Sequence, residues 1–204
     1  MASKLNFEEF LLEMKKVFDT YIEEFENRAR GMSLHSKAYL EKSRISASLS
    51  VMLIITCTFK DVNLSKFKDD TLFKQFVFHG SLASRLILDI FSVSRDIQKG
   101  SENYVLLKQD ELGCSLKQSL DLTIKLYNRR VTKMKSLRKM IESDLSRSGK
   151  RNLREAISFI DAYVNGVIDW SSLTLRYKSK QNAELSVSLS GRQSRKFHPA
   201  FFLE

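Results

Sequence analysis

The stretch 82–107, LASRLILDIFSVSRDIQKGSENYVLL, decides the fold of this chain. Its apolar residues recur at helical spacing, yet polar side chains interrupt the apolar face before the pattern ends in KGSENYV. Residues three, four and seven apart share one face of a helix, so Asp89, Ser92 and Asp96 lie together. A hydroxyl and a carboxylate one turn apart suit Mg²⁺, and the adjacent Arg95 suits a phosphate oxygen. The same residues also fit a solvated helix face, so the pattern alone leaves both interpretations open.

The rest of the sequence also predicts helices. The chain has one proline and seven glycines in 204 residues, and few turn-forming residues favour helices joined by short loops. The apolar periodicity predicts helices over 5–30, 37–59, 71–99 (broken near His79–Gly80), 103–112, 114–146 and 152–177. No run of residues reads as a strand. We therefore predict an all-α domain over residues 1–178, followed by a polar, loosely ordered tail over 179–204.

Charge and composition limit the kinds of partner and the cellular location that we expect. Lys and Arg outnumber Asp and Glu by 34 to 24, which permits an anionic partner, although solvated helix faces are the simpler explanation of the excess. The most basic run, 125–154, contains no nucleic-acid motif or aromatic platform, so we expect no nucleic-acid partner. Cys57 and Cys114 lack metal-ligand spacing and indicate a reduced, intracellular protein. The most apolar run, 49–59, is too short to span a bilayer, and we expect a soluble, cytoplasmic protein.

The order of residues in 88–105 resembles the second metal-binding motif of class I terpene synthases, NDxxSxxxE, with its following loop. The positions that match are Asp89, Ser92, Arg95, Asp96, Gly100, Asn103 and Val105. Leu88 stands where the family has its first metal ligand, and the last acid is shorter by one methylene. The resemblance implies that Ser92 and Asp96 hold Mg²⁺ and that Arg95 binds the substrate diphosphate.

The segment 25–50, FENRARGMSLHSKAYLEKSRISASLS, resembles a second conserved region of the same family. The residues in register are Glu26, Asn27, Arg28, Gly31, Tyr39, Leu40 and Arg44. The resemblance implies that Arg44 senses the diphosphate. It also places Ser48 at the effector position, where the helix breaks in the family so that a carbonyl points at the departing group. A serine breaks a helix less readily than the family's glycine.

A third segment, NGVIDWSSLTLRYKS (165–179), resembles the closing helix of the family, with its tryptophan and its terminal Arg-Tyr pair. The resemblance implies that Arg176 and Tyr177 bind the substrate diphosphate. It extends over residues 20–178, which correspond to about the C-terminal half of a catalytic domain. The aspartate-rich motif of the family has no counterpart upstream of Arg44. Asp69 and Asp70 follow Arg44 in the sequence, whereas the family's motif precedes the sensor arginine.

The resemblance implies a lyase that ionises and cyclises a prenyl diphosphate, such as farnesyl or geranyl diphosphate, with Mg²⁺. The lost ligand at Leu88 leaves open an alternative: a catalytically inactive, truncated paralogue or fragment that acts as a helical binding or interaction protein. A truncated bundle exposes part of its former core, so we also expect a homo-oligomer.

Overall fold

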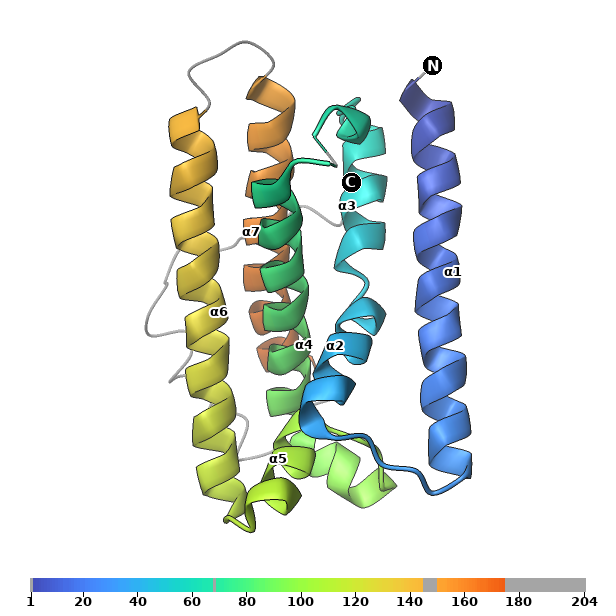
Figure 1. Ribbon diagram of the computed structural model, residues 1–204, viewed down its shortest axis with the longest axis vertical. Helices are drawn as coiled ribbons and strands as arrows, with labels where there is room; N and C mark the ends of the chain where they lie inside the picture. The colour runs from blue at the N-terminus through green and yellow to red at the C-terminus, as the bar shows by residue number, and fades with distance from the viewer. Residues whose placement is uncertain (1, 68, 145–149, 175–204) are drawn as a thin grey trace.

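A computed structural model describes residues 2–67, 69–144 and 150–174 (Figure 1). Every regular element within these residues is a helix, which confirms the all-α prediction. The helices are α1 (Ala2–Ala29), α2 (Ser36–Ser46), α3 (Leu49–Phe59), the 3₁₀ turn η1 (Leu64–Lys66), α4 (Thr71–Lys99), α5 (Tyr104–Leu112), α6 (Leu116–Asp144) and α7 (Lys150–Leu173). Two predicted features lie outside the described residues: the tail over 179–204, and Arg176 with Tyr177 at the end of the last predicted helix.

Helix α4 forms the centre of the bundle. In Figure 1, α1 and α6 occupy opposite edges, α2 and α3 follow one another between α1 and α4, and α5 closes one end. Burial explains this placement, because Phe76, Leu86, Ile87 and Ile90 of α4 are fully enclosed by the surrounding helices. Helix α4 is also long and apolar enough to cross a membrane by composition, but most of its apolar stretch is buried within the bundle.

Helix α4 runs without interruption through His79–Gly80, so the predicted break there was wrong. Gly80 serves helix packing instead. A Cβ at this position would lie 3.0 Å from Ile160 Cγ2 of α7 and 3.0 Å from Leu49 Cδ2 of α3. The missing side chain therefore lets three helices approach one another closely, and the intrinsic cost of glycine in a helix is offset by that contact.

The single helix predicted over 37–59 is divided into α2 and α3. Ser48 adopts the left-handed conformation at the break, with φ of 59°, although it is not a glycine. Hydroxyl groups from distant helices satisfy the carbonyls that the break leaves unpaired: Tyr163 donates to Ala47 O (2.6 Å) and Tyr21 to Ser46 O (3.2 Å). The break thus depends on tertiary contacts, which helix propensity does not include.

Helix α1 keeps an apolar face uncovered. Its large exposed apolar residues include Phe7, Leu11, Phe18, Ile22 and Phe25. Phe18, Ile22 and Phe25 recur at steps of four and three residues, so they form one stripe along the helix. α1 lies at one edge of the bundle (Figure 1), and the side chains of this stripe are exposed.

Candidate functional site

A cavity of about 360 Å³ opens between α1, α2, the C-terminal half of α4 and the loop that follows it. Four basic side chains line it: Arg28, Arg85, Arg95 and Lys99. Three acidic side chains, Glu24, Asp96 and Glu102, also contribute to the wall, together with the rings of Tyr21, Phe25 and Tyr39. The site therefore combines positive charge with aromatic surface at one end of the predicted metal motif.

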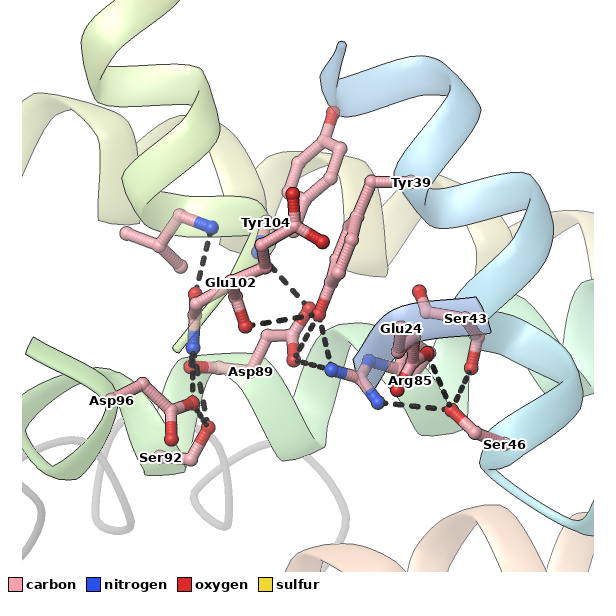
Figure 2. Close-up of polar contacts among 12 residues, drawn as sticks. Glu24, Tyr39, Ser43, Ser46, Arg85, Asp89, Ser92, Asp96, Glu102 and Tyr104 are labelled. Atoms are coloured by element: carbon pink, nitrogen blue, oxygen red, sulfur yellow. Dashed lines mark hydrogen bonds and ion pairs between the residues drawn. The ribbon is translucent and has the colours of Figure 1, made fainter. Parts of the chain in front are cut away.

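A buried ion pair forms the inner wall of the cavity. Arg85 Nη2 lies 2.8 Å from Asp89 Oδ1, and the carboxylate is 1% exposed. Asp89 also accepts hydrogen bonds from the Tyr39 hydroxyl (3.2 Å) and the Tyr104 backbone N–H (3.1 Å) (Figure 2). Burial opposes the charge on Arg85, but the Asp89 carboxylate keeps the pKa of Arg85 above its usual value. Arg85 therefore remains charged.

The guanidinium of Arg85 has further contacts that fix its position. It donates to Ser46 Oγ (3.2 Å) beside the α2–α3 break and to the Tyr39 hydroxyl, and it lies 5.2 Å from the centre of the Tyr39 ring. Figure 2 shows Arg85 between Tyr39, Asp89 and Ser46. These contacts connect α4 to α2, so the cation at this wall is positioned before any ligand arrives.

The predicted metal ligands, Ser92 and Asp96, lie side by side one turn further along α4. Asp96 Oδ2 accepts hydrogen bonds from Ser92 Oγ and from Asn103 Nδ2 (2.9 Å). Its other oxygen, Oδ1, accepts from Arg95 Nε (2.9 Å) and Nη2 (2.7 Å). Both carboxylate oxygens are thus occupied by donors from the protein.

This donor set limits how a divalent metal can be held. In the part of the chain that the structure describes, no group of three His, Cys, Asp or Glu residues could hold a metal ion. Leu88 offers no ligand, which leaves one carboxylate and one hydroxyl. Mg²⁺ is commonly held by one or two carboxylates, with substrate phosphates and water completing its six ligands. One carboxylate and one hydroxyl are therefore compatible with a divalent ion whose remaining ligands do not come from His, Cys, Asp or Glu side chains of the described residues.

The structure brings only some of the predicted site residues to the cavity. Arg95 and Asp96 line the cavity. Ser92 does not line it, but its hydroxyl donates a hydrogen bond to the Asp96 carboxylate. Arg44 is not among the lining residues; its guanidinium lies 4.8 Å from the centre of the Phe78 ring, and burial lowers its pKa. Ser48 lies at the helix break, where its hydroxyl donates to Ser46 O (3.2 Å).

Sequence reasoning assigned no role to several residues of the cavity, notably Arg85, Lys99 and Glu24. A signal for the first two was present. Arg85, Asp89, Ser92, Asp96 and Lys99 follow one another at steps of four, three, four and three residues, and therefore mark a single polar stripe on an apolar helix. Glu24 and Arg28 come from α1, and no pattern within α4 could have indicated them.

Opposing effects act on the pKa of Glu24, an acid in the cavity wall. Burial raises its pKa above the usual 4.5, and this effect outweighs the nearby Arg85 and the hydrogen bond from Ser46 Oγ (3.4 Å). Ionisation of Glu24 is therefore less favourable in the cavity wall than in water.

The helical bundle and the cavity beside the Ser92–Asp96 motif define a class of protein: an α-helical domain of the class I terpene synthase type. The family model for terpene synthase family 2, C-terminal metal binding, matches residues 1–133. The chain therefore belongs to this family.

The fold is similar to that of linalool/nerolidol synthase from Streptomyces clavuligerus. The TM-score is 0.73 at 16% sequence identity, and the match covers 80% of this chain and 58% of that one. At this identity the likeness establishes the fold alone, and the chain spans less than two thirds of the synthase. A comparison with curated proteins gives no match.

Proposed function

We propose that this chain performs terpene synthase-type lyase chemistry and binds the diphosphate of a prenyl diphosphate, such as farnesyl or geranyl diphosphate, in the cavity. One observation carries the proposal: the basic side chains Arg28, Arg85, Arg95 and Lys99 converge beside the Ser92–Asp96 pair. A leaving diphosphate needs cations around its oxygens, and a cavity lined with guanidinium groups supplies them.

Each group in the cavity would have a distinct part in the reaction. Ser92 and Asp96 would hold Mg²⁺, which supplies charge neutralisation at the leaving diphosphate when it is bound. Arg95 can exchange the Asp96 carboxylate for a phosphate oxygen, and this exchange would free Asp96 as a ligand. The rings of Tyr21 and Phe25 also line the cavity, where aromatic groups would stabilise a positive charge on the prenyl chain.

The remaining assignments rest on the resemblance. Arg44 as the diphosphate sensor, Ser48 as the effector, and Arg176 with Tyr177 as diphosphate ligands stay predictions. So do the cytoplasmic location and the homo-oligomer. Tyr21 and Phe25 are exposed on α1, whereas a carbocation needs an environment without water. Cyclisation therefore requires that this part of α1 be covered during the reaction.

The test is diphosphate release, with product analysis by gas chromatography, from purified protein given Mg²⁺ and farnesyl or geranyl diphosphate. We expect terpene formation that the double variant Ser92→Ala/Asp96→Ala abolishes. The matched control is Asp121→Ala/Ser136→Ala, which removes the same groups from the exposed surface of α6. Equal activity in the Ser92→Ala/Asp96→Ala protein would refute the assignment of these ligands.

A second candidate function is the binding of a prenyl diphosphate without turnover. Leu88 in the ligand position favours it, as does the full occupation of Asp96 by Arg95, Ser92 and Asn103. Saturable binding of farnesyl diphosphate by folded protein, without release of diphosphate under any metal condition, would select this candidate over the lyase.

A further inference from the structure

We propose that the cavity binds a diphosphate group without a divalent ion, through the cations of α1 and α4. The inference rests on the proposed function, because it concerns the same cavity, but it reverses the expected dependence on metal. It begins with Arg28 and Lys99. Within the described residues, neither side chain forms an ion pair with a carboxylate. Their charges are available to an anion.

Arg28 is nevertheless held in place. Its Nη2 donates to Lys99 O (2.9 Å) and its Nη1 lies 3.5 Å from Ser101 Oγ, so it bridges the end of α1 to the end of α4. Both partners are uncharged. The contact orders the guanidinium without neutralising it, and an ordered cation loses less conformational entropy when it binds an anion.

Arg85 and Arg95 supply the other side of the cavity. The carboxylates of Asp89 and Asp96 fix these guanidinium groups at 2.8 and 2.7 Å. Buried Arg85 Nε has no hydrogen-bond partner among the described residues. The Arg85 side chain lines the cavity and is 16% exposed, so a phosphate oxygen there can approach this charge.

The C-terminal end of a helix usually repels anions, because its last carbonyls point outward. At α4, three of the last four carbonyls are already engaged. Asp96 O accepts from the Ser101 N–H (2.9 Å), Ile97 O from the Gly100 N–H (3.3 Å), and Lys99 O from Arg28. The repulsion at the cavity is thereby reduced. Arg28 and Lys99 place two positive charges there, and Glu24 and Glu102 line the same cavity.

The same geometry favours binding of the diphosphate before binding of the metal ion. Both oxygens of Asp96 are engaged by Arg95, Ser92 and Asn103 in the absence of ligand. An anion needs no such rearrangement to meet Arg28 and Lys99. By linkage, a bound diphosphate that attracts Arg95 would raise the affinity of Asp96 for Mg²⁺, and Mg²⁺ would raise the affinity for diphosphate by the same factor.

Isothermal titration calorimetry of inorganic pyrophosphate into the purified full chain tests this inference, once in EDTA and once in MgCl₂. We expect saturable binding in EDTA that Arg28→Gln and Lys99→Gln each weaken by about tenfold, the loss of one charge-assisted contact. The control, Lys125→Gln, removes one exposed charge from α6, which does not line the cavity, and should leave the affinity unchanged.

The other outcomes separate the two proposals. Binding that requires MgCl₂ would overturn the metal-independent site and leave the proposed function standing. No binding of pyrophosphate in either buffer would overturn both. An equal loss of affinity in Lys125→Gln and Lys99→Gln would show unspecific attraction to a basic protein, and would also overturn the inference.

Discussion

Arg85 and Asp89 form a buried ion pair one turn apart on α4, and Asp89 joins that helix to two others. Its carboxylate accepts from Tyr39 of α2 and from the first backbone N–H of α5, at Tyr104. The Arg85 side chain is 16% exposed, and this small exposure is toward the cavity. One pair of residues therefore both stabilises the bundle and places a cation in its site.

The ion pair gives the first prediction. Arg85→Leu leaves the Asp89 carboxylate buried without its counter-charge, which should cost about 3–5 kcal/mol in the free energy of unfolding. Urea denaturation followed by circular dichroism measures this cost. Arg151→Leu removes one partner of the exposed Arg151–Glu155 pair and should cost less than about 1 kcal/mol. Similar losses in the two variants would mean that burial does not strengthen the Arg85–Asp89 interaction.

The helix break at Ser48 gives a second prediction. The left-handed conformation is unfavourable for a residue with a Cβ, and the φ of Ser48 is 59°. Ser48→Gly should therefore stabilise the fold by about 0.5–1 kcal/mol, after the entropic cost of glycine and the lost hydrogen bond to Ser46 O. Thermal unfolding provides the measurement. Ser48→Val should destabilise; a stabilised valine variant would indicate that the helix does not break there.

Glu24 gives a prediction about pH. Burial raises its pKa in the folded state above 4.5, so the folded protein favours the protonated carboxyl. Its contribution to stability is complete below pH 4.5 and is lost as pH rises through the folded-state pKa. Glu24→Gln should thus raise the melting temperature at pH 7 and change it little at pH 4. A variant that is less stable than the parent at pH 7 would contradict the raised pKa.

The apolar stripe on α1 gives a fourth prediction. The expected homo-oligomer would bury Phe18 and Ile22, which are 57% exposed in the single chain. Light scattering should show self-association that Phe18→Glu/Ile22→Glu reverses. Met140→Glu is the control, because this residue is 50% exposed on α6, away from the stripe. A monomer at high protein concentration would refute the prediction.

Local patterns account for most of the fold. Apolar spacing predicted the helices that the structure contains, and Gly31 and Gly100, both with positive φ, end α1 and α4 where the sequence indicated. Two predictions failed for one reason. The break near Gly80 and the continuous helix over 37–59 were both predicted from helix propensity. Gly80 instead allows close packing against Ile160 and Leu49, and hydroxyls from Tyr21 and Tyr163 stabilise the break at Ser48, the position at which the family resemblance placed a break.

For the candidate site, too, some features follow from local sequence and others from the packing of helices. By itself, the sequence determined the all-α fold and the polar face of α4 that holds Asp89, Ser92 and Asp96, because helical periodicity acts within one segment. The tertiary structure decided which charges meet. Arg28 reaches Lys99 across 71 residues of sequence, whereas Arg44 packs on Phe78 and does not line the cavity. Such encounters depend on how whole helices pack, and no local pattern specifies them.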